Sequence, residues 1–448
     1  MKLIQKTAAI LLSACMLVPA AAIVSSAEST QTGETDYTIT SPYDDIDWDT
    51  YNYYLANLHT HCTASDGRVD LPDMIELYYK AGYDILSLTD HGVINNGWNQ
   101  ERKIYPPFNL FQELHNMSDE DYERITTGSD RDGRGMTDVV GGIEMNMATL
   151  TKTHVNGYFT EYGSGLWGKE NDYESAPAAV EASGKGFTVL NHVGDWVNSN
   201  NFPERSHHPM FIEYFANIFV KNPSCLGMEI INSTDNVTRA DKALWDELLQ
   251  VVIPKGRNII AFADDDSEYA NEVGRSFEMF VLPENNLENV KQAMQDGAFF
   301  ACSRFAKTDI APDFEGNGLV PLVSKIDVDQ KENTITLTLD DTRDCQSVEW
   351  IANGEIIATG NSIDLNDYED QLGCYIRFQL KGEGGITYSQ AFTLSYDGRA
   401  DKEIPHYAKF DGFFGDIFKK IVKTRFFAII MKICEKFDYD IVGAIAKY

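Results

Sequence analysis

Histidines and carboxylates recur at the ends of several apolar runs in this chain of 448 residues. The densest group is the stretch from Asn57 to Gly67, which contains His59, His61 and Asp66. Residues two apart on a strand face the same side, so the two imidazoles project together. Two adjacent imidazoles, followed by a carboxylate in a turn, are ligands that suit a transition metal. The stretch therefore predicts part of a metal site.

Four further apolar runs end in residues of the same kind. The runs are 85–88, 139–143, 187–190 and 259–263, and they are followed by Thr89-Asp90-His91, Glu144, Asn191-His192 and Asp264-Asp265-Asp266. Five of the nine histidines belong to this set, namely His59, His61, His91, His154 and His192. In an α/β barrel the carboxyl ends of the strands meet at one mouth. Because burying imidazoles and carboxylates without a cation is costly, the pattern predicts a metal cluster there.

The runs themselves are the elements that must position these side chains. They are short and apolar, as is typical of buried parallel strands. Amphipathic helical patterns at 71–81 and 240–252 lie between them. Alternation of strands and helices over residues 54–305 predicts an α/β barrel or a doubly wound sheet.

The pattern changes after this region. Residues 334–339 alternate with period two, and Asn353-Gly354 is a hairpin turn between two strand-like runs. These features predict a small, immunoglobulin-like β-sandwich over residues 306–398.

A helical tail is predicted over residues 399–448. Residues 409–448 carry apolar residues at helical spacing and have eight Lys and Arg against five Asp and Glu. Two interpretations stay open: a helix packed back on a domain, or an interfacial helix on an anionic membrane or wall polymer.

The amino-terminal residues indicate export. Lys2 and Lys6 precede the apolar stretch 8–18, and small residues near Ala27 suit a signal peptidase, so 1–27 is predicted to be a cleaved signal peptide. The protein would then be secreted or lie on the extracellular surface. The competing interpretation is a lipoprotein anchored at Cys15, which the apolar residues after that cysteine disfavour. Residues 28–53 are rich in acids and are predicted to be a solvated linker.

Net charge and cysteine usage exclude other classes. The chain has 37 Lys and Arg against 69 Asp and Glu, a net charge of −32, which would repel nucleic acid. An anionic substrate would need a locally positive site, and a metal cluster supplies one. The seven cysteines form no C-x-x-C pair, and the sequence leaves open whether Cys345 and Cys374 form a disulfide.

The order of the motifs resembles that of the PHP (polymerase and histidinol phosphatase) superfamily. The matching segments are His59-Thr60-His61, Ser65-Asp66-Gly67, Thr89-Asp90-His91, Gly142-Ile143-Glu144, 154–158, Gly274-Arg275 and 296–301, which span residues 54–304. The resemblance implies a distorted seven-stranded β/α (TIM-like) barrel. It also implies phosphoester hydrolysis, of a monoester or a diester, at a trinuclear metal site.

The resemblance also implies a division of the ligands among three ions. The first ion would be held by His59, His61, Glu144 and Asp266, the second by Glu144, His154 and His192, and the third by Asp66 and His91. Up to three divalent ions are expected, Mn, Fe or Zn, with Mg also compatible.

The last motif departs from the family pattern. The family has Asp-x-His there, and this chain has Asp266-Ser267-Glu268, which puts Glu268 in the position of the histidine. A shifted register would use Asp264 and Asp266 instead. A carboxylate in place of an imidazole favours Mn, Fe or Mg over Zn, or weakens that site.

A hydroxide generated at the metal ions would attack phosphorus. Asp90 would orient a ligand, carry a proton or serve a structural role, and Arg275 is the first candidate for a phosphate clamp, ahead of Arg131 and Arg134. The segment between His91 and Glu144 is predicted to be a lid. The expected substrate is a small or surface-bound phosphoester. The alternatives are a hydrolase of another ester or of an amide, and a surface-binding protein without turnover.

Overall fold

The computed structural model describes residues 35–146, 152–165, 172–199, 201–234, 238–408, 411–437 and 439–447. Residues 36–448 form one compact unit. The predicted signal peptide and Cys15 lie outside the described residues. No described helix is both long enough and apolar enough to cross a membrane.

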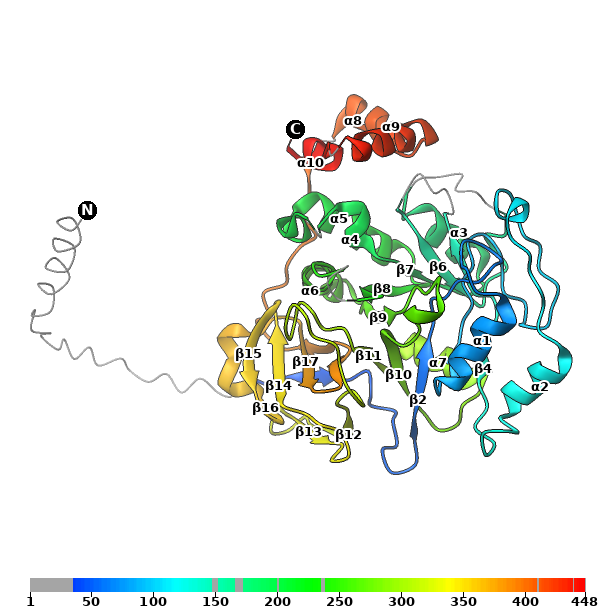
Figure 1. Ribbon diagram of the computed structural model, residues 1–448. Helices are drawn as coiled ribbons and strands as arrows, with labels where there is room; N and C mark the ends of the chain where they lie inside the picture. Colours follow the sequence, from blue (N-terminus) through cyan, green and yellow to red (C-terminus); the bar gives the residue numbers. More distant parts are fainter. Residues whose placement is uncertain are drawn as a thin grey trace, which may run out of the picture. The chain divides into compact units, whose positions relative to one another are not determined.

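The strands form three sheets (Figure 1). The first contains β5 (Ile143–Met145), β6 (Val155–Tyr158), β7 (Phe187–Leu190), β8 (Cys225–Asn232) and β9 (Ile260–Asp264). The second contains β1 (Thr38–Thr40), β2 (Asn52–Asn57), β3 (Ile85–Leu86), β4 (Thr137–Asp138), β10 (Ser276–Leu282), β11 (Phe299–Ser303), β14 (Ser347–Ala352), β15 (Glu355–Thr359), β17 (Tyr375–Gly382), β18 (Gly385–Tyr388) and β19 (Phe392–Ser395). The third contains β12 (Val323–Asp329), β13 (Thr334–Leu339) and β16 (Ser362–Asp364).

The described α-helices are α1 (Leu71–Lys80), α2 (Asp119–Thr127), α3 (Ser175–Ser183), α4 (Val193–Val197), α5 (Pro209–Lys221), α6 (Asp241–Val252), α7 (Leu287–Asp296), α8 (Gly412–Val422), α9 (Arg425–Lys436) and α10 (Ile441–Lys447). Helix α3 packs on β7, α5 and α6 pack on β8, and α7 packs on β10 (Figure 1). The chain is therefore of mixed α/β class, with helices against the strands that lead to the candidate site.

Local sequence explains where these elements begin and end. Helix α1 starts where the Asp70 carboxylate accepts a hydrogen bond from the Leu71 amide, and it buries Met74 and Tyr78 on one face. Strands β7 and β8 are buried along their whole length, as expected of strands covered on both faces. The strand expected at 139–143 is broken instead, because Gly141 has a φ of 72° and separates β4 from β5.

The strand pairings around the candidate site form a closed circuit. Strand β2 pairs in parallel with β3, β5 to β7 pair antiparallel in sequence, and β7, β8 and β9 pair in parallel. Two isolated parallel bridges complete the circuit: Thr60 with Ser267 links the ends of β2 and β9, and His91 with Glu144 links the end of β3 to β5. The closing bridges therefore lie among the predicted metal ligands.

The carboxy-terminal β-region is continuous with this part of the fold. Strand β11 pairs antiparallel with β18, and the rings of Phe300 and Phe378, one from each side of that junction, lie 6.2 Å apart between centroids. The buried ion pair of Arg377 with Asp246 on α6 joins the same two regions. A sheet and a shared core thus cross the boundary expected at 305/306.

The described part of segment 28–53 differs from the solvated linker that its acidity predicts. Strand β1 pairs with β19, and Tyr37, Ile39 and Tyr43 are buried in the core. The acids of residues 44–49 stay exposed. Composition averaged over the segment hides this alternation of apolar and acidic residues.

The six cysteines of the described part are free, so Cys345 and Cys374 are not joined. The Cys374 thiol instead lies 3.5 Å from the carbonyl oxygen of Leu249 on α6.

Candidate metal centre

Eight predicted ligands converge where the strands of the circuit end. His59, His61 and Asp66 follow β2, His91 follows β3, Glu144 lies on β5, His154 directly precedes β6, His192 follows β7, and Asp266 follows β9. His192 and Asp266 have positive φ values, 29° and 47°, which non-glycine residues rarely adopt. Such backbone strain is typical of residues held for function.

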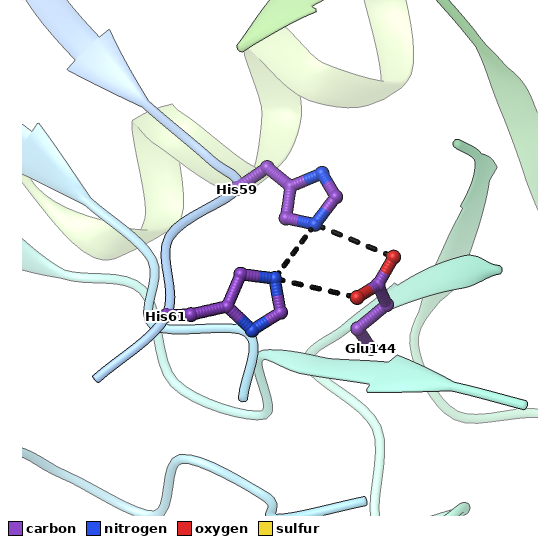
Figure 2. A group of neighbouring side chains, drawn as sticks. All are labelled: His59, His61 and Glu144. Atoms are coloured by element: carbon purple, nitrogen blue, oxygen red, sulfur yellow. Dashed lines mark hydrogen bonds and ion pairs between the residues drawn. The ribbon is translucent and has the colours of Figure 1, made fainter. Parts of the chain in front are cut away.

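The first group of ligands is His59, His61 and Glu144 (Figure 2). The two Nε2 atoms lie 3.2 Å apart, and they lie 3.4 and 3.3 Å from the two carboxylate oxygens of Glu144. Asp266 adds a fourth ligand, because its Oδ1 lies 3.1 Å from each Nε2 atom. These four residues are the set expected for one ion.

The second group is His61, Asp66 and His91. Asp66 Oδ2 lies 3.3 Å from His91 Nε2, and Asp66 Oδ1 lies 3.5 Å from His61 Nδ1. Asp66 and His91 are the pair expected for another ion. His61 belongs both to this group and to the first.

The third group is His91, Glu144 and His154. Glu144 Oε1 lies 3.1 Å from His154 Nδ1 and 3.5 Å from His192 Nε2, and Glu144 Oε2 lies 2.9 Å from His91 Nδ1. Each oxygen of the Glu144 carboxylate therefore faces more than one imidazole. This buried carboxylate is the centre around which all five histidines are arranged.

The donor atoms fit divalent cations. Imidazole nitrogens and carboxylate oxygens are the ligands that zinc, iron and manganese take in proteins. The Nδ1 atom of His192 is buried without a hydrogen-bond partner, so one lone pair or proton of that ring is unsatisfied. A cation among these groups would satisfy such atoms and balance the carboxylates.

The charges of the site are strongly coupled. Burial opposes ionisation of Glu144 and Asp266, but the surrounding histidines hold the pKa of both carboxyls well below the usual range. Burial also disfavours the charged imidazoles, yet the neighbouring carboxylates raise the pKa of His91 to about 10 and that of His192 to about 9. Without a cation, protons on the imidazoles balance the carboxylates, and a metal would have to displace them.

Glu229 orients two of the histidines, and the sequence analysis missed it. This fully buried residue of β8 lies with Oε1 2.6 Å from His59 Nδ1, and its Oε2 accepts a hydrogen bond of 2.8 Å from the His192 amide. Asn232 donates to both Glu229 and Asp266 at 3.0 Å. Glu229 thereby turns His59 Nε2 toward the cluster, as carboxylates behind metal-bound histidines do. A single acid inside the apolar run 226–231 was the available signal.

Each of the three consecutive aspartates after the last predicted run has a different role. Asp264 accepts a hydrogen bond from the Leu58 amide, and burial raises its pKa to about 8. Asp265 accepts hydrogen bonds from the backbone amides of 274–276. Asp266 alone faces the histidines after β2. The geometry thus favours the register with Asp266 as ligand over the shifted one that also uses Asp264.

Glu268 lies beside this cluster but in none of its three groups. It is half-buried, and burial, followed by the charge of Asp66, raises its pKa. The backbone around it is fixed, because the Glu268 amide donates to Glu272 and the Glu268 carbonyl accepts from Arg68.

Asp90 is a positioning residue in this structure. Its carboxylate accepts hydrogen bonds of 2.9 Å from the Cys62 amide and 2.8 Å from the Ser65 hydroxyl. It therefore holds the loop that carries His61 and Asp66. Of the roles expected for Asp90, these contacts favour the structural one.

The three arginines predicted as phosphate clamps lie in two places. Arg275 Nη1 donates to the Ser233 hydroxyl at 2.9 Å, next to the end of β8, so its guanidinium lies at the edge of the site. Arg134 and Arg131 instead pair with Asp84, at distances of 2.6 and 3.5 Å. Asp84 precedes β3, whereas the ligands follow the strands, so these two arginines lie at the wrong end to clamp a substrate.

The segment between β3 and β5 is fastened to the ligand loop. Gln112 donates to the carbonyl oxygens of Ser65 and Gly67 at 3.3 and 3.0 Å. The Arg102 side chain is buried beside Asp90, with 3.6 Å between Nη1 and Oδ2. The predicted lid is thus anchored next to Asp66.

Comparisons with known proteins leave the function to be argued from the site. No family model matches the chain, and no curated protein matches it. Seven solved chains do. One is a two-domain protein from Bacteroides vulgatus that contains a predicted PHP-like metal-dependent phosphoesterase; it is 17% identical, with 79% of this chain and 89% of that chain covered and a TM-score of 0.41. At this level of similarity, function has to be inferred from the geometry of the site itself.

Proposed function

We propose that this protein is a metal-dependent phosphoesterase of the PHP type, which hydrolyses a phosphate monoester or diester. The observation that carries the proposal is the convergence of five imidazoles on the buried carboxylate of Glu144, with Asp66 and Asp266 beside them. So many buried carboxylates and imidazoles are costly to hold together without a bound cation.

Three ions are proposed for this site. His59, His61, Glu144 and Asp266 would hold the first, Glu144, His154 and His192 the second, and Asp66 and His91 the third. When bound, divalent ions activate water and neutralise phosphoryl oxygens. Mn, Fe or Zn suit the mixture of nitrogen and oxygen ligands, and the carboxylate-rich side near Glu268 also suits Mg.

The residues of the chain position these ligands. Glu229 holds the ring of His59, and Asp90 holds the loop of His61 and Asp66. Arg275 lies at the edge of the site, where it would contact an anionic group of the substrate. At a net charge of −32, the protein needs the metal ions to attract an anion, and long nucleic acids would be repelled.

The finer architecture is part of the same proposal. The circuit of β2, β3, β5, β6, β7, β8 and β9 would be the distorted seven-stranded barrel, with its mouth at the ligands. The sheet of β12, β13 and β16 and the carboxy-terminal strands of the second sheet, β14, β15, β17, β18 and β19, would form the immunoglobulin-like sandwich. Secretion is proposed from the pattern of residues 1–27 alone.

Metal analysis and turnover test the function. The protein lacking residues 1–27 should copurify with divalent metal and hydrolyse a generic aryl phosphate monoester or diester. H59A and H61A should each lose metal and activity. H207A is the matched control, because that exposed histidine pairs with Glu247 away from the cluster.

Three results would change the assignment. Wild-type protein that binds no added metal would refute the metal site. Turnover of carboxyl esters or amides, but not of phosphoesters, would make it a different hydrolase. Metal binding without turnover of any of these substrates would make it a binding protein.

A further inference from the structure

The tail helices α8 and α9 carry a row of exposed, large apolar side chains. The row consists of Ile417, Ile421, Phe426, Ile429, Ile433 and Phe437, and their exposed fractions lie between 39% and 76%. Ile417 and Ile421 are four residues apart on α8. Phe426, Ile429 and Ile433 on α9, together with Phe437 directly after it, recur at intervals of three and four residues. Residues at these intervals share one face of a helix. Each helix therefore presents an apolar face to solvent, which a stable soluble surface rarely does.

Lysines border both apolar faces. Lys420 is three residues after Ile417, and Lys436 is three residues after Ile433, so each neighbours the row on its helix. Lys419, Lys420 and Lys436 are all exposed. The tail is net positive in a chain whose net charge is −32. An apolar row edged by lysines is typical of helices that lie at a membrane interface.

Polar contacts attach the tail to the rest of the unit and leave the row exposed. Lys423 forms an ion pair of 2.8 Å with Glu174 at the start of α3. Asp440, just before α10, forms an ion pair with Arg205. These contacts use charged side chains of the tail rather than the apolar row.

We propose that the exposed faces of α8 and α9 dock this protein peripherally on an anionic lipid surface. The phenylalanines and isoleucines would enter the boundary between headgroups and acyl chains, and the lysines would contact anionic headgroups. The helices have 11 and 12 residues, too few to span a bilayer, so they lie in its plane.

Charge and hydrophobicity together select lipid over the other candidates. An anionic wall polymer would attract the lysines, but it offers no apolar phase for the Phe and Ile side chains. A second copy docked tail to tail would bring two net positive segments together. An anionic bilayer supplies both the apolar phase and the opposite charge.

Vesicle cosedimentation tests the docking. The protein lacking residues 1–27 retains the compact unit 36–448. It should sediment with vesicles of phosphatidylcholine mixed with phosphatidylglycerol, more weakly with pure phosphatidylcholine, and less as salt is added. The triple variant F426S, I433S and F437S should bind at least about tenfold more weakly, because its apolar row is interrupted.

Matched variants separate the contributions. The double variant L319S and I356S replaces two apolar residues that are each 54% exposed in the carboxy-terminal β-region, and it should bind like the wild type. The triple variant K419Q, K420Q and K436Q should lose about 100-fold in affinity for the anionic vesicles and most of the salt dependence. Circular dichroism and turnover of the aryl phosphate should be unchanged in all three variants, which keeps docking distinct from catalysis.

The proposal is overturned if the wild-type protein binds neither kind of vesicle, or if the serine triple variant binds as tightly as the wild type. It is also overturned if sedimentation velocity shows self-association that the serine triple variant abolishes, while vesicles bind no form of the protein. In that case the row is an interface between copies of the chain.

Discussion

Replacing Glu229 by glutamine should weaken metal binding without removing any ligand. The Glu229 carboxylate lies 2.6 Å from His59 Nδ1 through one oxygen and accepts from the His192 amide through the other. A glutamine can accept only one of these hydrogen bonds, because its amide nitrogen is a donor and would face a second donor. One buried donor is then left unsatisfied, which costs about 1–3 kcal/mol.

The loss should appear in metal affinity. Residues behind a metal ligand typically contribute about 10- to 100-fold in affinity. We expect the upper end, because Glu229 supports two ligands at once and is fully buried. A 100-fold loss equals about 2.8 kcal/mol. Competition with a chromophoric chelator, on metal-free protein reloaded with Mn or Zn, measures it directly.

A second buried glutamate supplies the control. Glu278 lies on β10, and burial, with the neighbouring Asp264, raises the pKa of its carboxyl well above the usual range. E278Q replaces a buried carboxyl whose ionisation is disfavoured with an amide of the same size, and it should leave metal affinity unchanged. Equal metal affinity in E229Q and the wild type would refute the orienting role of Glu229. An equal loss in E229Q and E278Q would show a general packing effect instead.

Three further outcomes are expected. Loading metal-free protein with metal at neutral pH should release protons, because His91 and His192 have pKa values of about 10 and about 9 without metal. Calorimetry in buffers of different ionisation enthalpy counts the released protons. A count of zero would contradict the coupling between metal binding and deprotonation of the imidazoles. The same raised pKa values stabilise the metal-free fold below about pH 6.5, and this contribution is lost as pH rises through 9 to 10. The melting temperature should therefore fall over that window. A melting temperature that does not change with pH would count against the charged imidazoles. R134A should lower the free energy of unfolding by about 1–2 kcal/mol and leave KM unchanged, because Arg131 still pairs with Asp84. A raised KM at unchanged stability would show that Arg134 contacts the substrate.

The metal ligands can be predicted from the sequence because the position of each one depends only on the residues next to it in the chain. Residue type and placement just after an apolar run predict which side chains gather at one end of a set of strands. His59, His91 and Glu144 were identified on that basis, and the structure brings them together. The same rule failed for Glu229, because it lies inside a run whose other side chains are apolar and only its partner His59 explains its burial.

Other features depend on contacts between distant segments. The pairing of β1 with β19 joins residues more than 350 positions apart, and no composition average over 28–53 predicts it. Arg131 and Arg134 are candidate phosphate clamps from the sequence because arginine binds phosphate. In the structure both form ion pairs with Asp84, at the end of β3 away from the metal ligands. Sequence alone predicts what a side chain can bind, whereas the fold decides what lies within its reach.

The closure of the strand circuit and the metal site depend on the same residues. The bridge of His91 with Glu144 pairs two ligands through their backbones. In the bridge of Thr60 with Ser267, Thr60 lies between His59 and His61 in the sequence, and Ser267 directly follows Asp266. Without a cation, the carboxylates at this closure are balanced only by protons on the imidazoles, and that balance weakens as pH rises. A metal ion shared by His59, Glu144 and Asp266 would join the ends of β2 and β9 to β5. Metal binding should therefore stabilise the closure of the circuit as well as supply its chemistry, because the same ligands carry both.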